Sequence, residues 1–356
     1  MARYKVGMVF DPRYLQQLYE LNKNNCKNKI YQVYGSVVKD SKYTARPSYR
    51  LPNISDEELS WYVRELRSIG IELAYTMNTS YICKQYGSEI FKKEFKERVK
   101  YLVSIGINRY IVASPFFANL IREINPHIKI EVSTIAHIDT ITQIKMWHDR
   151  YCIDSVCMNL LKNREVSFIK NSVNYCKEND INVELIVNEF CGNGINNSST
   201  HCIFRDQCYL LHSEGYTESE CEQNGYPILE CRASRDKAIN WLKLNYIRPE
   251  DIYRYEEIGV DNFKITGRTG KRLHSIKIIE AYMKEKMQGN LLDLWGHFES
   301  EKNKGNIPDI YIDNAKLEGF VEYWFHNEGM RCSEQVCGKT CNYCDYYWDK
   351  LRVQSH

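Results

Sequence analysis

The sequence carries little net charge and no long apolar segment. Its 356 residues have a formal net charge of +2, so the composition gives no reason to expect an anionic membrane or a nucleic acid as a partner. The first residues, "MARYKVGMVFDPRY", lack the apolar core of a signal peptide, and no apolar run reaches the roughly 18 residues of a membrane span. We therefore expect a cytoplasmic protein without a membrane partner, and nucleic acid is not the favoured substrate.

Three common functional motifs are also missing. No G-x-G-x-x-G follows the first predicted strand, which argues against a dinucleotide-binding sheet. The chain contains neither H-E-x-x-H nor G-x-S-x-G, two frequent signatures of hydrolases. Cysteine, in contrast, is abundant, with fourteen residues. In a reducing compartment this number favours metal ligation or redox chemistry over structural disulfides.

Short β-type runs alternate with amphipathic segments along most of the chain. Strands are predicted at residues 4–10, 30–37, 71–78, 109–115, 129–136, 153–159, 182–190 and 261–268. The segment "SDEELSWYVRELRSIG" begins with a capping-box pattern and ends at Gly, where helices commonly stop. Strand–helix alternation implies parallel strands, and eight units indicate an α/β fold, the (β/α)8 TIM-type barrel. An open doubly wound sheet is the alternative.

The predicted domain organisation places the barrel at residues 1–290 and a cysteine-rich C-terminal extension at residues 291–356. The barrel carries a cysteine-bearing insertion at residues 191–232, directly after the seventh strand. The segment between the seventh and eighth strands is longer than one helix and two loops require. Because it follows a strand, the insertion is expected at the C-terminal mouth of the barrel, where active sites of this fold are built.

Four cysteines of the insertion form a first candidate metal site: Cys191, Cys202, Cys208 and Cys231. Four thiolates satisfy a tetrahedral zinc ion or a 4Fe–4S cluster. Zinc fingers favour closely spaced cysteine pairs, so the wide spacing here suits a cluster at the barrel mouth better. Cys221 is a fifth candidate ligand. Four free thiols are the simpler alternative, but their polar Gly- and Asn-rich surroundings favour ligation.

The C-terminal extension contains a second candidate metal site, Cys332-x4-Cys337-x3-Cys341-x2-Cys344. The last three cysteines have the C-x3-C-x2-C spacing of radical S-adenosylmethionine enzymes. Those enzymes carry the motif after an early barrel strand, whereas here only about a dozen residues follow Cys344. A second 4Fe–4S cluster and a structural zinc ion both remain open, and the cluster is favoured.

Five charged residues near the predicted strand ends are the candidate catalytic residues. Arg164 and Glu165 follow the sixth strand, Glu189 ends the seventh, and Lys264 and Arg268 belong to the eighth. Alternate strand residues face the same side, so Lys264 and Arg268 are expected to share a side and to hold a carboxylate or phosphate. The alternative for Arg164 and Glu165 is an ion pair with each other, either at the surface or supporting the site from behind.

Several segments, read together, resemble a known family. They are "EVSTIAHID", "NREVSFIKN", "VELIVNEFC…CIFRDQC", "ECR" and "RPEDIYRYEEIGVDNFKITGR". In this order they resemble the collagenase-like peptidase family U32, over about residues 100–270, and in particular its iron–sulfur branch related to oxygen-independent hydroxylation proteins. The sequence departs from the family at Thr266, where the family has Glu, and in the longer spacer between Cys191 and Cys202.

The resemblance implies a (β/α)8 barrel that commonly carries a four-cysteine 4Fe–4S cluster. It also implies one of two activities: peptide hydrolysis, or redox modification of a small molecule, peptide or RNA. Ligation by four protein thiolates leaves no open position for water, which favours an oxidoreductase. The leading hypothesis is therefore an iron–sulfur redox enzyme served by an electron donor such as a ferredoxin. A peptidase with structural cysteines and a non-catalytic cluster-bearing partner protein are the alternatives.

Overall fold

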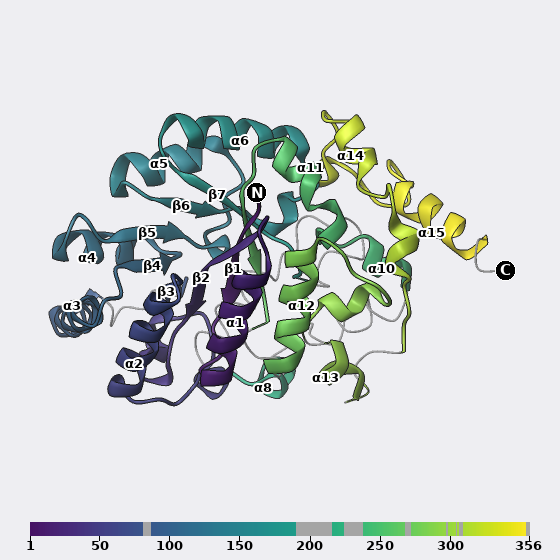
Figure 1. Ribbon diagram of the computed structural model, residues 1–356. Coiled ribbons are helices and arrows are strands. Elements are labelled where there is room, and N and C mark those ends of the chain that lie inside the picture. The colour runs from purple at the N-terminus through teal and green to yellow at the C-terminus, as the bar shows by residue number, and fades with distance from the viewer. Residues whose placement is uncertain are drawn as a thin grey trace.

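Eight parallel strands close into a barrel surrounded by helices (Figure 1). The computed structural model describes residues 1–80, 87–189, 216–223, 238–267, 272–296, 298–303, 305 and 309–353. The strands are β1 (Arg3–Gly7), β2 (Lys29–Gly35), β3 (Glu72–Met77), β4 (Arg109–Val112), β5 (Lys129–Val132), β6 (Ser155–Cys157), β7 (Asn182–Ile186) and β8 (Asn262–Ile265). Since β1 pairs in parallel with both β2 and β8, the predicted barrel is confirmed and the open sheet is wrong.

All eight strands end earlier than predicted, and after two of them a serine caps the helical segment that follows. The hydroxyl of Ser114 accepts a hydrogen bond from the amide of Phe116, and Pro115 opens the next helix, so β4 stops at Val112. Ser133 similarly caps the short 3-10 helix η4 (Thr134–Ala136) and ends β5. These early turns bring polar side chains to the strand ends.

Helices pack around the barrel in the expected alternation. The longer ones are α1 (Pro12–Asn24), α2 (Asp56–Ser68), α3 (Glu89–Ser104), α4 (Pro115–Ile124), α5 (Ile141–Tyr151), α6 (Val166–Glu178), α12 (Arg272–Lys284) and α15 (Tyr343–Val353). Shorter helices are α8 (Glu218–Gln223), α10 (Ala238–Leu242), α11 (Ile252–Glu257), α13 (Phe298–Asn303) and α14 (Glu322–His326). The predicted capping box of α2 is confirmed, with reciprocal hydrogen bonds between Ser55 and Glu58.

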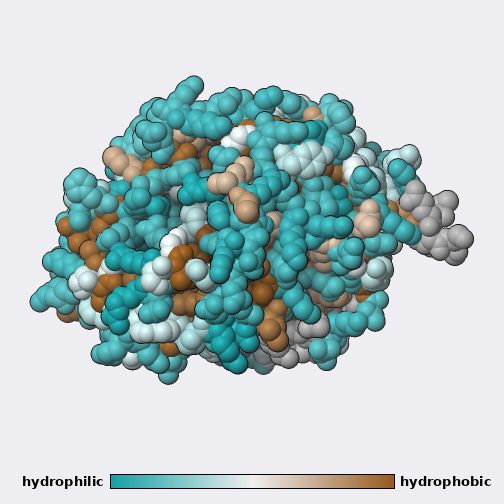
Figure 2. All heavy atoms as spheres, in the orientation of Figure 1, coloured by the Kyte–Doolittle hydropathy of each residue, from teal (hydrophilic) through white to brown (hydrophobic). Residues whose placement is uncertain are grey.

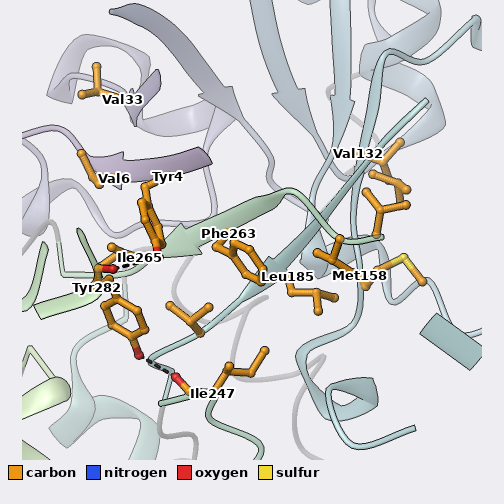
Figure 3. Packing of buried hydrophobic residues seen from close by; sticks show 14 of the residues in the cluster. Tyr4, Val6, Val33, Val132, Met158, Leu185, Ile247, Phe263, Ile265 and Tyr282 are labelled. Atoms are coloured by element: carbon orange, nitrogen blue, oxygen red, sulfur yellow. Dashed lines mark hydrogen bonds between the residues drawn. The ribbon is translucent and has the colours of Figure 1, made fainter. Parts of the chain in front are cut away.

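The main hydrophobic core lies between the strands and the surrounding helices. Tyr4, Leu185 and Phe263 point outward from their strands and are fully buried (Figure 3). Two tyrosine hydroxyls are satisfied there by backbone carbonyls: Tyr4 donates to Tyr282 at 2.9 Å, and Tyr282 donates to Ile247 at 2.8 Å. Buried hydroxyls with partners avoid the desolvation cost of unpaired polar groups.

The C-terminal extension packs against the barrel through α10 and α11, where α14 and α15 lie beside them (Figure 1). The ring of Phe325 meets that of Tyr255 edge-on at 5.2 Å. The buried guanidinium of Arg248 pairs with Asp251 and donates to the carbonyl of Asn314 at 2.9 Å. Extension and barrel side chains belong to one hydrophobic cluster, so these segments share a core. The domain boundary at residue 290 stays a prediction.

The surface in Figure 2 is mostly hydrophilic, with small separate hydrophobic areas. Among the described helices, none combines the length and apolar composition needed to cross a bilayer.

The barrel interior contains a series of buried charges. Side chains from six strands form alternating ion pairs, which we call the charge ladder: Glu72, Arg109, Glu131, Lys5, Glu184 and Lys264. Lys5 joins the two halves of the ladder, because its ammonium lies 2.6 Å from both the Glu131 and the Glu184 carboxylates. Burial alone would raise the pKa of Glu131, but Lys5 and Arg109 hold it below its ordinary value.

Lys5→Met is expected to destabilise the protein by about 3–5 kcal/mol, because it leaves two buried carboxylates without their shared cation. Chemical denaturation at pH 7 measures the change. Lys5→Met combined with Glu184→Gln should recover part of the loss, since one of the stranded charges is then gone. Because the folded pKa of Glu131 is lowered, its contribution is present above the ordinary Glu pKa and lost as the pH falls through the folded value. A Lys5→Met protein as stable as the wild type would contradict the ladder.

Candidate functional site

Neutral polar side chains lie at the C-terminal ends of the strands. The Thr76 hydroxyl donates to the Ser36 hydroxyl at 2.8 Å. The Asn78 amide donates to the Ser133 hydroxyl at 3.3 Å, and its oxygen accepts from Thr44 at 3.2 Å. All five side chains are buried. They form part of the predicted mouth, which in this fold is the usual place of an active site.

Asn188 joins three elements at the same end of the barrel. Its side-chain oxygen accepts from the amide of Thr266 at 2.6 Å. Its side-chain nitrogen donates to the carbonyls of Thr266 at 3.1 Å and of Leu294, in the 3-10 helix η9 (Leu291–Leu294), at 2.9 Å. Asn188 therefore fixes the ends of β7 and β8 to the extension. The predicted catalytic residue Glu189 follows it directly and is partly exposed.

Lys264, the second predicted catalytic residue, ends the charge ladder near the mouth. Its ammonium lies 3.8 Å from a Glu184 carboxylate oxygen and 4.4 Å from the centre of the Tyr34 ring. Cys157 faces the same carboxylate, and burial, followed by the charge of Glu184, raises the pKa of its thiol to about 12. Lys264 thus enters the interior as predicted, beside a neutral thiol that burial makes unreactive.

Arg164 and Glu165 follow β6 but turn away from Lys264. Glu165 is buried and pairs with Lys162 at 3.0 Å, just before α6. Arg164 is also buried, and it points towards the C-terminal extension. No hydrogen bond or ion pair within the described ranges joins either residue to Lys264. Their catalytic role stays a prediction, and the structure places them beside the extension and at the start of a helix.

Four cysteines of the extension, which we call the tail cysteines, lie near one another, and two of them lie beside Arg164. They are Cys332 in the 3-10 helix η11 (Cys332–Glu334), Cys337, Cys341, and Cys344 in the first turn of α15. Cys337 and Cys341 face each other across a β-bridge, and the amide of Gly338 donates to the carbonyl of Cys341 at 3.0 Å. A tight turn therefore brings these two thiols to one place.

Two N–H groups point at sulfur atoms of the tail cysteines. The indole nitrogen of Trp324 lies 3.1 Å from Cys332 Sγ, and a guanidinium nitrogen of Arg164 lies 3.9 Å from Cys344 Sγ. Burial raises the pKa of Cys344 to about 12, whereas Arg164 acts to lower it and the other three tail cysteines act to raise it. The four thiols are therefore near enough to influence one another's charge.

The surroundings of Arg164 test whether a metal centre fits here. Its guanidinium donates to the carbonyl of Leu242 at 2.7 Å and lies 4.3 Å from the centre of the Trp324 ring. No carboxylate among the described residues forms an ion pair with it. As the side chains stand, no three Cys, His, Asp or Glu residues in the described ranges are arranged to hold a metal ion. The observation that fits a negatively charged thiolate centre is the buried cation beside Cys344 and Cys332.

Five predicted site residues lie outside the described residues: Cys191, Cys202, Cys208, Cys231 and Arg268. The backbone of Cys221 belongs to α8, and its side chain also lies outside the description. The predicted barrel cluster and the pairing of Lys264 with Arg268 therefore stay predictions.

A groove of about 400 Å³ lies along α12 and the segment after it, lined by His274, Lys277, Met287 and Leu294 among others. None of the predicted site residues lines it. Its size falls within the usual range of small-molecule pockets. We place the candidate site at the charged groups and thiols, where the chemistry is concentrated.

Sequence reasoning missed Glu184 and Trp324 as parts of these sites, and it missed the bonds that Asn188 makes. Glu184 lies in a predicted strand, where a charged residue among apolar neighbours was a usable signal. The bonds of Asn188 to three elements have no signature in the sequence. Trp324 lies eight positions before Cys332, and aromatic residues near cysteines are too common to predict a donor to sulfur.

Comparison with known proteins gives consistent matches. The family model for Peptidase family U32 matches residues 19–290. The uncharacterized protease MJ1657 of Methanocaldococcus jannaschii is 26% identical over 256 residues, which cover 71% of this chain and 69% of that protein. The solved structure of the U32 peptidase Mk0906 superposes with a TM-score of 0.51 at 14% identity, over 75% of this chain and 93% of that chain. At this identity the structural likeness shows the fold alone, and it agrees with the closed barrel.

Asn188→Ala is expected to lower the free energy of unfolding by about 2–4 kcal/mol, because three backbone groups of Thr266 and Leu294 lose their partner. Urea denaturation measures the change. Asn327→Ala is a matched control, since Asn327 is exposed and makes one bond to Tyr323; it should change stability by less than about 0.5 kcal/mol. Equal effects of the two substitutions would show that Asn188 does not fix the strand ends.

Proposed function

Because the chain belongs to peptidase family U32, we propose that it is an iron–sulfur redox enzyme of this family. The tail cysteines hold one 4Fe–4S cluster, and Cys191, Cys202, Cys208 and Cys231 hold a second at the barrel mouth. The reaction is an oxygen-independent hydroxylation or a related modification of a small molecule, a peptide or RNA. An electron donor of the ferredoxin type supplies the electrons, in the cytoplasm.

One observation supports this proposal above all: the buried guanidinium of Arg164 lies beside Cys344 and Cys332 and has no carboxylate partner among the described residues. Removing a cation from water costs several kcal/mol unless an anion compensates for it. Neutral thiols compensate poorly. Four thiolates around a metal centre carry net negative charge, so Arg164 becomes the counter-ion of that centre.

An iron–sulfur cluster, when bound, supplies one-electron transfer. Residues of this chain would set its potential, since Trp324 and Arg164 direct N–H groups at two of the sulfurs. The rings of Phe320 and Tyr323 stack with that of Tyr343, which precedes Cys344, and Trp324 meets Tyr343 edge-on, so the cysteines would have an aromatic surrounding. A zinc ion would satisfy Arg164 equally well, but it would leave these tuning contacts without a redox role.

At the barrel mouth, the described residues would bind and orient the substrate. Ser36, Thr76, Asn78 and Ser133 supply neutral hydrogen-bonding groups, and Lys264 supplies a cation. Glu189, partly exposed after β7, is the candidate for accepting or donating a proton. Arg164 acts on the tail cysteines and is a positioning residue in this scheme.

Metal and sulfide analysis of the full chain, purified without oxygen, tests the proposal. Each cluster holds about four iron and four sulfide ions, so two clusters give about eight of each and a brown protein. Cys341→Ala should lose the iron and sulfide that the tail cysteines hold. Cys208→Ala should lose the iron and sulfide of the barrel cluster. A colourless protein that holds zinc alone would refute a redox enzyme. So would peptide hydrolysis that survives removal of all metal.

Arg164→Met is expected to lower the reduction potential of the tail cluster, because a buried positive charge favours the more negative reduced state. The shift should be several tens of millivolts, where about 59 mV corresponds to a tenfold change for one electron. A redox titration followed by electron paramagnetic resonance measures it. Arg164→Lys should restore part of the potential. Arg331→Met is the matched control, since Arg331 adjoins Cys332 but is half exposed and pairs with Glu334. Equal potentials in all four proteins would exclude Arg164 as the counter-ion.

A further inference from the structure

Lys264 is a second buried cation whose partners are incomplete. The residue is 6% exposed. Among the described residues, its ammonium has no acceptor at hydrogen-bonding distance, because the nearest carboxylate oxygen, on Glu184, is 3.8 Å away. The other contact is the face of the Tyr34 ring at 4.4 Å, which attracts a cation more weakly than an anion does. Three N–H donors are therefore available at this position.

The charge ladder explains why Glu184 does not neutralise Lys264. Its carboxylate lies 2.6 Å from Lys5, and Lys5 is also 2.6 Å from Glu131. Glu131 in turn pairs with Arg109, which pairs with Glu72 at the other end of the series. The ladder contains three positive and three negative side chains, but its two ends differ in their exposure to water. The negative end, Glu72, is 43% exposed and is screened by water, whereas the positive end, Lys264, is buried.

The position of Lys264 directs this excess charge to the barrel mouth. Lys264 belongs to the second half of β8, beside Ile186 of β7 in the register of the sheet. Thr266, two residues further on, is already at the strand end and is held by Asn188. The buried positive end of the ladder therefore lies in the half of the barrel that leads to the mouth, where Ser36, Thr76 and Ser133 supply neutral polar side chains.

We propose that Lys264 binds a carboxylate group of the substrate at the barrel mouth. The buried part of the charge ladder carries an excess of one positive charge. A single positive charge matches a carboxylate better than a phosphate dianion. Lys264 would donate to the carboxylate oxygens, and the charge-assisted bond would form in a site shielded from water, where it is strong. The polar side chains of the mouth carry no charge, so they would bind the neutral part of a small organic acid. This inference concerns a binding site in the barrel and does not require a metal centre.

Thermal unfolding of the full chain in sodium acetate and in sodium chloride, at equal ionic strength and pH 7, tests this site. Acetate is a small carboxylate, so it should enter any pocket that accepts a larger acid. A ligand that binds only the folded state raises the unfolding midpoint. We expect acetate to raise the midpoint of the wild type above its value in chloride. Lys264→Met should weaken the apparent acetate affinity at least about tenfold.

Lys264→Arg should retain part of the acetate effect, and the surface variant Lys284→Met should retain all of it. Lys284 is 66% exposed and pairs with Glu280, so it controls for the loss of a lysine from the segment after β8. In chloride, Lys264→Met should be at least as stable as the wild type, because it removes an uncompensated buried charge. A Lys264→Met protein that fails to fold would show that the ammonium of Lys264 already has the partners it needs in the wild type. The proposal would then be wrong.

Three further outcomes would overturn the site: no acetate-specific rise in the wild type, an undiminished rise in Lys264→Met, or a larger Lys264-dependent rise with inorganic phosphate. The last result would assign a phosphate to Lys264. Acetate binding is compared in proteins of equal iron content. A negative acetate result would therefore overturn the Lys264 site without bearing on the iron–sulfur proposal.

Discussion

A cation removed from water must be matched by an anion, and this constraint links the two candidate sites. Arg164 and Lys264 are both buried, and neither forms a close ion pair with a carboxylate among the described residues. Arg164 lies beside two of the tail cysteines, and Lys264 lies in the second half of β8. The two proposals supply the matching negative charge, on a metal–thiolate centre for Arg164 and on a substrate carboxylate for Lys264.

The closed barrel makes both arrangements possible. Closure brings β1, β5 and β7 together in the interior, so that Lys5 meets two carboxylates from distant parts of the sequence. It also gathers the strand ends into one mouth, which Asn188 ties to the extension through Leu294. The extension shares the hydrophobic core of the barrel. The tail cysteines are thus held against the barrel by the same packing that stabilises the fold.

Much of the fold followed from local patterns, whereas the pairing of charges did not. The short β-type runs, the capping-box pattern at Ser55 and Glu58 and the rhythm of eight units predicted the barrel, because these signals act within a few residues. Lys5 and Glu131 are 126 positions apart, and nothing local indicates that they meet. Arg164 was expected at the mouth because it follows a strand. The short 3-10 helix η5 (Leu160–Lys162) and the buried Asn163, which donates to the carbonyls of Ile186 and Asn245, set the course of the chain there.

The distance along the chain between Arg164 and Cys344, 180 positions, has a consequence for the order of assembly. A growing chain completes β6 and buries its own strands long before α15 is made. The four thiols alone would be an ordinary cysteine-rich peptide, open to oxidation and to any thiophilic ion. Only the folded barrel brings Arg164 beside Cys344, so under the iron–sulfur proposal the counter-charge of the cofactor belongs to the folded protein and not to the cysteine motif.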